Sequence, residues 1–422
     1  MIRSKLTAIL ALFLILGLVL AMDSPVLAKR KWTSTSGTTT TTTTTTSGST
    51  STSGTTTTSG TTTSGTTTTS GSTVTSGTTT TSGTTTASDP TTTTYGTTSG
   101  TTTPTTTAPV KKVLGFTTYY YTGDTGSYNS MAANSTALDM IATATHTTDG
   151  LGNITGTVPT NQLSLAKQNG QTPLVLVGND FSATVAQTLL GNAVNRQTFI
   201  TNLLSLIRNN GYTGVNLDLE GIPVADRANY TSFVQQVASA LHPSGYLVTV
   251  SVPAKTSDSP YNTWAYPYDY AGIAAAADQI LIMSYDEHYP GGSPGPIASI
   301  GWVDQVAAYA VSVIPREKIL LGVAAYGYDW YGSNTKAYSI TGCVSLAATN
   351  NATVLWDATA QSPYFSFNDS TGVKHTVHFE NAQSLGYKLD LANRYNLAGI
   401  GIWRLGLENT DYWSMIRTKF NR

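Results

Sequence analysis

The stretch GYTGVNLDLE, residues 211–220, decides the fold of this chain. A glycine follows a helical pattern, and apolar and polar residues then alternate, which predicts a β-strand. The alternation places Asn216, Asp218 and Glu220 on one face and the valine and leucines between them on the other. We expect the apolar face to pack beneath helices, whereas two carboxylates have no place in an ordinary core. A carboxylate at the C-terminal end of a strand indicates a catalytic edge; the alternative is a structural ion pair.

Residues 1–109 differ in composition from the rest of the chain. Residues 1–28 combine a short basic start, an apolar run over residues 6–21 and a small residue, Ala28, before a basic pair. Because this run is shorter than the ~20 residues that span a bilayer, the pattern predicts a secretory signal peptide. Residues 29–109 are almost entirely Thr, Ser and Gly, which predicts a disordered linker. We therefore expect a secreted or cell-surface protein, with the linker acting as a tether to the cell wall.

Residues 110–422 are enough for one large domain with a substantial core. The chain has 22 Lys and Arg against 23 Asp and Glu, with no basic stripe, so a nucleic-acid partner is excluded. The single cysteine, Cys343, excludes an intramolecular disulfide. Tyrosine is abundant, with 23 residues, which suits a sugar-binding groove as well as a core. We expect a monomer.

Apolar runs bounded by turn residues recur along this domain and alternate with helical patterns. The predicted strands are residues 112–117, 138–143, 172–178, 211–220, 246–252, 279–285, 318–324 and 398–403. The predicted helices are residues 195–209, 225–241, 268–277, 303–313 and 412–420. Strands alternating with helices over about three hundred residues predict an α/β fold, the (β/α)8 TIM barrel. The competing fold is a doubly wound open sheet, which would more often show a Gly-rich phosphate turn after its first strand.

One connection is too long for a simple crossover. Residues 327–379 hold two strand-like pieces, residues 364–367 and 376–378, between the seventh and eighth predicted strands. We therefore predict a small α+β insertion after the seventh strand, on the rim of the barrel.

The strand of residues 211–220 resembles the signature of glycoside hydrolase family 18, the chitinase-like barrels. That signature is Asp-x-x-Asp-x-Asp-x-Glu at the end of the fourth strand. Glu220 falls on the general acid of the family and Asp218 on the aspartate beside it. Asn216 replaces the second aspartate and Thr213 replaces the first.

Other motifs of the family occur in the same order. Residues 283–286, Met-Ser-Tyr-Asp, match Met-x-Tyr-Asp of the sixth strand, and Trp403 matches the tryptophan of the eighth. Phe116 stands where the first strand carries an aromatic residue, and Tyr326 belongs to a Tyr-Gly pair like that of the seventh strand. Residues 285–296 look most like the bacterial spore-cortex and peptidoglycan-hydrolase (spore germination) branch, although that branch often carries small peptidoglycan-binding repeats in place of a Thr-rich tether.

The resemblance implies a retaining glycosidase in which the 2-acetamido oxygen of the substrate attacks the anomeric carbon. Glu220 would be the acid and base, kept protonated by the neighbouring charge of Asp218. Asp218 would orient the acetamido group and Tyr285 would donate a hydrogen bond to it. The remaining residues with implied roles would bind the sugar: Asn216, Asp286, Trp403, Phe116 and Tyr326.

The implied substrate is a β-1,4-linked N-acetylglucosamine polymer, with peptidoglycan or spore cortex first and chitin second. A different class of function is a non-catalytic chitin- or peptidoglycan-binding lectin on the same barrel, and a third is a surface or coat scaffold. Glu220 favours the enzyme, whereas Thr213 and Asn216 leave the lectin open.

Several of these residues also have simpler interpretations. Asn216 fits a supporting hydrogen-bonding layer under Asp218, and Trp403 and Tyr326 fit the barrel core. His375 and His378 are three residues apart, so on a strand they point to opposite faces and predict no metal site. We expect neither a metal nor a cofactor.

Overall fold

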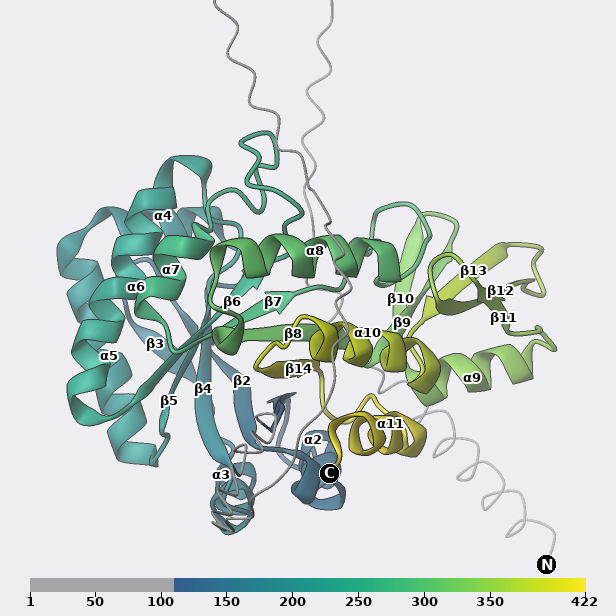
Figure 1. Cartoon of the computed structure of the whole chain (residues 1–422), viewed down its shortest axis with the longest axis horizontal. Coiled ribbons are helices and arrows are strands. Elements are labelled where there is room, and N and C mark those ends of the chain that lie inside the picture. The colour runs from purple at the N-terminus through teal and green to yellow at the C-terminus, as the bar shows by residue number, and fades with distance from the viewer. Residues whose placement is uncertain (1–109) are drawn as a thin grey trace, which may run out of the picture. The chain divides into compact units, whose positions relative to one another are not determined.

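The computed structural model describes residues 110–422, and these residues form a closed barrel with a lateral insertion (Figure 1). Of the nine strands in the main sheet, eight run parallel, and the barrel closes because β1 pairs with both β14 and β2. The ninth, β3 (Ile154–Gly156), runs antiparallel to β2. The barrel strands are β1 (Lys112–Thr117), β2 (Met140–Thr148), β4 (Thr172–Gly178), β5 (Gly214–Asp218), β6 (Leu247–Pro253), β7 (Gln279–Met283), β8 (Ile319–Ala324) and β14 (Gly399–Trp403).

Helices connect the strands and cover the outside of the barrel (Figure 1). They are α2 (Gly126–Ala133), α3 (Thr160–Gln168), α4 (Ala183–Gly191), α5 (Ala193–Asn210), α6 (Arg227–Leu241), α7 (Tyr270–Ala276), α8 (Ile300–Val313), α10 (Ala382–Arg394) and α11 (Thr410–Phe420). Short 3₁₀ turns lie at Ser135–Ala137, Val224–Asp226, His242–Ser244 and Arg316–Lys318. Within the described residues every helix is too short or too polar to cross a lipid bilayer. The predicted (β/α)8 barrel is confirmed.

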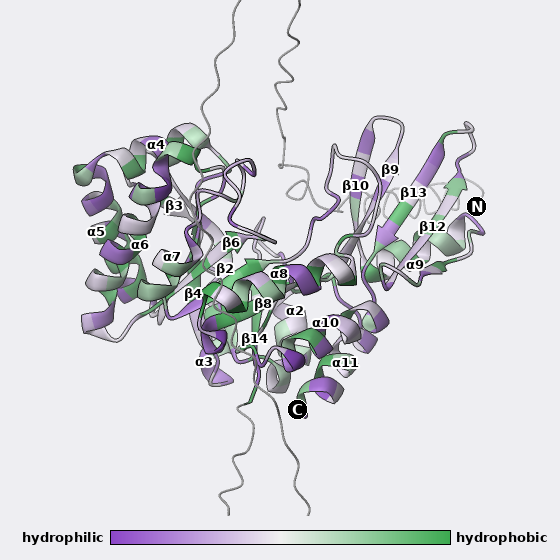
Figure 2. Ribbon diagram, turned by 45° about the horizontal axis from the view of Figure 1, so that its top comes forward, coloured by the Kyte–Doolittle hydropathy of each residue, from purple (hydrophilic) through white to green (hydrophobic). Residues whose placement is uncertain are grey.

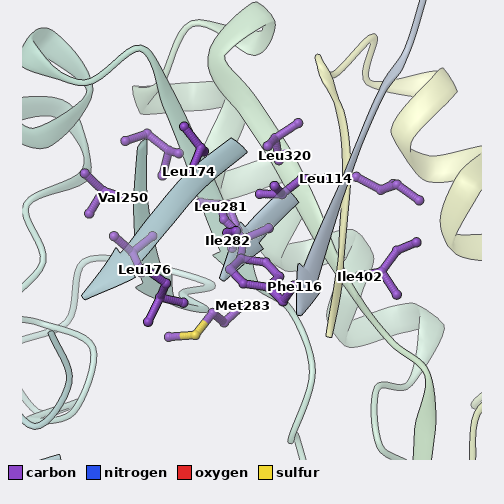
Figure 3. Close-up of a cluster of buried hydrophobic side chains, with 14 of the residues drawn as sticks. Leu114, Phe116, Leu174, Leu176, Val250, Leu281, Ile282, Met283, Leu320 and Ile402 are labelled. Carbon is purple, nitrogen blue, oxygen red and sulfur yellow. The ribbon is translucent and has the colours of Figure 1, made fainter. Parts of the chain in front are cut away.

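Burial on both faces explains the apolar character of the strands. Val215 and Leu217 of β5 are fully buried on the outward face, beneath the helices. Figure 3 shows buried apolar side chains of several barrel strands, among them the consecutive residues Leu281 and Ile282 of β7. Phe116 and Met283 both belong to this buried cluster. Figure 2 shows the hydrophobic residues concentrated in the barrel strands, whereas the surrounding helices mix hydrophobic and hydrophilic residues. This is the pattern expected of a parallel sheet covered by amphipathic helices.

The insertion follows the seventh barrel strand, as predicted. Its five strands pair antiparallel in the order β10-β9-β13-β12-β11, and one helix packs on the sheet. A small core of its own holds it together, made of Cys343, Ala347, Phe365, Val377 and Phe379. Its elements are β9 (Tyr326–Tyr331), β10 (Asn334–Ser339), α9 (Ile340–Thr349), β11 (Leu355–Asp357), β12 (Ser362–Asn368) and β13 (Lys374–Phe379).

Two predicted strands end earlier than expected. The strand predicted for residues 211–220 spans Gly214–Asp218, because Gly211 adopts a left-handed conformation that ends α5 and Glu220 lies beyond the last ladder pair. The strand predicted for residues 279–285 ends at Met283. The predicted signal peptide and linker, residues 1–28 and 29–109, lie outside the described residues.

A buried ion pair joins the end of the insertion to α10. The Lys388 ammonium lies 2.7 Å from the Glu380 carboxylate, and both side chains are about 1% exposed. The hydroxyl of Ser384 donates a further hydrogen bond to Glu380. Removing one member of such a pair leaves an uncompensated charge in a low-dielectric environment.

We therefore expect Lys388→Met to lower the free energy of unfolding by about 3–5 kcal/mol. The matched control is Lys419→Met, which breaks an exposed pair with Asp390 and should cost less than about 1 kcal/mol. Urea denaturation of both variants measures the difference. An equal loss of unfolding free energy in the two variants would show that the buried pair stabilises the protein no more than the exposed pair does.

Candidate active site

The C-terminal ends of the parallel strands surround a cleft of about 570 Å³. All parallel strands of a closed barrel end at the same rim, so side chains from distant parts of the sequence meet there. The cleft is lined by Phe116, Tyr119, Tyr120, Ala144, Thr145, His146, Thr147, Thr155, Gly156, Leu176, Gly178, Asn179, Asp180, Phe181, Asp218, Glu220, Ser251, Met283, Tyr285, Asp286 and Trp403.

Six of the eight residues that the sequence singled out line this one cleft. Asp218 is the last residue of β5, and Glu220 follows two residues later with 4% of its surface exposed. Tyr285 and Asp286 follow β7 after one intervening residue, Ser284. The other two are Phe116 and Trp403, whose rings lie 5.5 Å apart at 54° and form part of the cleft wall.

Tyr326 does not line the cleft and is fully buried. Its hydroxyl donates a 2.5 Å hydrogen bond to Oδ1 of Asp286, and the hydroxyl of Tyr328 donates a second one of 3.0 Å to the same oxygen. Asp286 has a positive φ of 59°, a conformation that non-glycine residues adopt only when neighbours hold it. The expected sugar contact of Tyr326 is therefore replaced by a contact that orients Asp286.

Asn216 is also fully buried and lies inside the barrel rather than in the cleft. Its Nδ2 donates to Oγ1 of Thr249 at 2.9 Å, and Oγ of Ser251 donates to its Oδ1 at 2.9 Å. This geometry matches the supporting layer beneath Asp218 and leaves no surface of Asn216 for direct contact with a sugar. Ser251 itself reaches the cleft.

Sequence reasoning missed several lining residues in the last part of β2 and on the loop after β4. His146 lies at the end of β2, which continues past the predicted strand to Thr148. Asn179, Asp180 and Phe181 follow β4 directly, and the last two have positive φ values of 51° and 59°. The rule that barrel sites form at the C-terminal strand ends would have pointed to residue 179, which comes straight after a correctly predicted strand.

The charges that line the cleft have one sign. Four carboxylates reach it, from Asp180, Asp218, Glu220 and Asp286, and its lining residues include no lysine or arginine. Burial lowers the pKa of His146 to about 4, so its ring is neutral near pH 7. Carboxylates in a shared concave site create a negative potential, which favours cationic species formed there.

Two buried tyrosines lie behind Asp218 and Glu220. Tyr230 is completely buried, and its pKa is raised first by burial and then by the negative charges of Asp218 and Glu220. Tyr268 is buried beside it, with ring centroids 5.4 Å apart, and its hydroxyl donates to the Leu219 carbonyl at 2.9 Å. Both phenols therefore stay neutral.

The histidines outside the cleft have other partners. His375 shares a 2.8 Å hydrogen bond with Asp329, and His378 stacks on Tyr364. Nδ1 of His288 donates to the Pro296 carbonyl. Among residues 110–422, no group of three or more His, Cys, Asp and Glu side chains could hold a metal ion.

A family model matches this architecture: glycosyl hydrolases family 18 aligns with residues 117–408, which contain almost the whole barrel and its insertion. The chain belongs to this family. It is therefore a glycoside hydrolase. The alignment includes all the cleft-lining residues except Phe116.

Individual members are similar over most of their length. The chain is 35% identical to the glycosylase YvbX of Bacillus subtilis over 72% of this chain and 92% of that protein. Among solved structures, the spore cortex-lytic enzyme SleL of Bacillus cereus has a TM-score of 0.70 at 29% identity, covering 74% of this chain and 75% of that one. A chitinase from Chromobacterium violaceum has a TM-score of 0.69 at 30% identity, covering 74% and 99%.

The neutral His146 makes stability depend on pH. Its folded-state pKa of about 4 lies below the unfolded value near 6.5, so the unfolded chain binds more protons between these values and stability falls as pH drops from about 6.5 to 4. We expect His146→Gln to reduce the loss of unfolding free energy between pH 6.5 and pH 4 by about 1–2 kcal/mol, a range that allows for solvent screening at the cleft wall.

Urea denaturation at pH 7 and pH 4.5 measures this difference. The control is His242→Gln, at a histidine whose side chain is 41% exposed. An unchanged pH dependence in the His146 variant would show that its burial does not govern acid stability.

Proposed function

We propose that this glycoside hydrolase cleaves β-1,4 bonds in N-acetylglucosamine-containing polymers with retention of configuration, using the acetamido group of the substrate as the nucleophile. One observation carries the proposal: Asp218, Glu220, Tyr285, Asp286 and Trp403 line a single cleft. A retaining site without a protein nucleophile needs one acid and a group that orients the acetamido oxygen, and this cleft offers both.

Glu220 is the general acid and then the general base. Its carboxyl proton moves to the glycosidic oxygen as the bond from that oxygen to C1 breaks. The acetamido carbonyl oxygen bonds to C1 from the opposite face and forms a cyclic oxazolinium ion. Water then attacks C1, gives a proton to the Glu220 carboxylate and returns the electron pair to the acetamido oxygen. Two inversions at C1 leave the configuration retained.

The residues around Glu220 stabilise the charge that develops. Asp218 accepts a hydrogen bond from the acetamido N–H, and its negative charge favours the cationic oxazolinium. The other acidic residues that line the cleft also favour this cation. Tyr285, 6% exposed, donates its hydroxyl to the acetamido oxygen. Asp286, held by two tyrosine hydroxyls, accepts from a sugar hydroxyl.

The aromatic wall binds the apolar face of the sugar ring. Trp403 is half-buried and packs against Phe116, so its indole has one protein-covered side and one side toward the cleft. Sugar rings stack on such surfaces because their axial C–H groups are apolar. This arrangement supports a sugar-binding role for both rings.

Peptidoglycan or spore cortex is our first choice of polymer and chitin the second. The similarity to SleL, a spore cortex-lytic enzyme, and to a chitinase supports both. We further propose that the protein is secreted, acts as a monomer at the cell surface or wall, and is tethered by residues 29–109, because these residues follow a signal-peptide pattern.

We expect Glu220→Gln to lower kcat by two to four orders of magnitude with little change in binding, because the amide keeps the shape but cannot deliver a proton. Release of reducing ends from chitin oligosaccharides and from purified peptidoglycan measures the effect. The control is Glu317→Gln, at an exposed position far from the cleft in sequence and fold. Binding without turnover by the unmodified protein would instead favour a glycan-binding lectin.

We expect the acetamido group of the substrate to be required. Fully deacetylated oligosaccharides lack the attacking oxygen, so cleavage should fall below detection while the N-acetylated oligosaccharide of equal length is cleaved with the β-configuration retained. Proton NMR of the first product identifies the anomer. Efficient cleavage of the deacetylated chain, or an inverted first product, would defeat the substrate-assisted mechanism.

A further inference from the structure

Asn179 forms two hydrogen bonds with the backbone of Glu220. Its Oδ1 accepts from the Glu220 N–H at 2.8 Å, and its Nδ2 donates to the Glu220 carbonyl at 2.8 Å. A further bond of 3.1 Å runs from Nδ2 to the Ser182 carbonyl. Asn179 is 1% exposed and lines the cleft. Its side chain therefore satisfies both backbone polar groups of one residue.

Glu220 needs such a partner because it lies outside the sheet. The ladder between β4 and β5 ends with Gly178 opposite Asp218, and the ladder between β5 and β6 ends with Leu217 opposite Val250. Both ladders therefore end before residue 220. A carboxamide presents an N–H donor and a carbonyl acceptor in one plane, as a peptide group does, so Asn179 takes the place of the next residue of a paired strand.

The residues on either side of Glu220 are held as well. The Tyr268 hydroxyl donates to the Leu219 carbonyl at 2.9 Å. Gly221 has a positive φ of 69°, and a Cβ on it would lie 2.8 Å from the Phe181 carbonyl oxygen, so only glycine fits. The backbone from residue 219 to 221 thus has fixed neighbours on both sides, and Asn179 supplies the bonds at the central residue.

We propose that Asn179 is the positioning residue for the catalytic acid: its carboxamide replaces a strand neighbour and fixes the backbone of Glu220, and thereby the direction in which the carboxyl enters the cleft. This inference rests on the proposed role of Glu220 as the acid. It assigns Asn179 no contact with substrate and no part in proton transfer.

Only a carboxamide at this distance can both accept from the Glu220 N–H and donate to the Glu220 carbonyl. An alanine removes both bonds. An aspartate still accepts from the Glu220 N–H but places a carboxylate oxygen against the Glu220 carbonyl, two acceptors facing each other about 2.8 Å apart. A glutamine has the same groups on a longer stem, so it cannot keep both bonds without moving Glu220.

The kinetic test compares Asn179→Ala and Asn179→Asp with the unmodified protein on chitin oligosaccharides. We expect Asn179→Ala to lower kcat about 100-fold, as a displacement of about 1 Å of a reacting group does, with KM changed less than about threefold. The kcat of Asn179→Asp should lie between that of Asn179→Ala and that of the unmodified protein. The matched control is Asn195→Asp, at a buried asparagine of α5 whose Nδ2 donates to the Thr188 carbonyl and which does not line the cleft. The control should retain kcat.

A second readout does not depend on activity. Hydrogen exchange of the Glu220 amide should accelerate at least tenfold in Asn179→Ala, because its acceptor is gone, and should stay slow in Asn179→Asp, which keeps an acceptor. Exchange in the Asn195→Asp control should match the unmodified protein. Equal exchange rates of the Glu220 amide in all four proteins would overturn the positioning role of Asn179, whether or not the protein is active.

Failure of this inference and failure of the proposed function give different results. If the unmodified protein cleaves no N-acetylated glycan, the function fails, and hydrogen exchange still decides whether Asn179 holds Glu220. If Glu220→Gln is inactive but both Asn179 variants keep kcat, the function stands and the positioning role is overturned. An equal loss of kcat in Asn195→Asp would also overturn it, because the effect would then be one of general stability.

Discussion

The hydrogen bonds between β1 and β2 are the constraint on which the cleft depends. Without that ladder the sheet would be open, with β1 at one edge and β3 at the other. With it, eight parallel strands end at one rim and their following loops face one another. Residues far apart in the chain then share a wall of the cleft, as the pair Phe116 and Trp403 does.

The insertion contributes to the site and is not a separate appendage. Its first strand, β9, carries the two tyrosine hydroxyls that hold the carboxylate of Asp286. Its last strand leads into Glu380, whose buried ion pair with Lys388 ties that end to α10. Both ends of the insertion are thus attached to the barrel, and a backbone conformation at Asp286 that is unfavourable in isolation is kept in place by its surroundings.

The interior beneath the cleft combines a polar layer with an apolar surround. Asn216, Thr249 and Ser251 satisfy one another inside the barrel without adding a charge. A buried amide avoids the desolvation cost of a carboxylate at that position, so the carboxyl groups of this segment, Asp218 and Glu220, lie on the cleft side. The neutral phenol of Tyr230 closes the other side. This separation keeps the two carboxylates in a low-dielectric environment in which their effect on a bound cation is strong.

The sequence by itself was enough to determine the barrel and the place of the insertion, because strand periodicity is a local property. Periodicity also pointed to Asp218 and Glu220, whereas the resemblance to the motifs of the family supplied Phe116, Tyr285, Asp286 and Trp403. The sequence predicted β1 and β4 at their observed bounds and β6, β8 and β14 to within one residue, and it predicted that Glu220 stands at a strand end. Only the tertiary structure decided that Tyr326 orients Asp286, that Asn216 faces Thr249, and that Asn179 bonds the backbone of Glu220 across 41 residues. These contacts depend on which strand ends become neighbours after closure and on where each ladder stops, and neither property is encoded in a single segment of the chain.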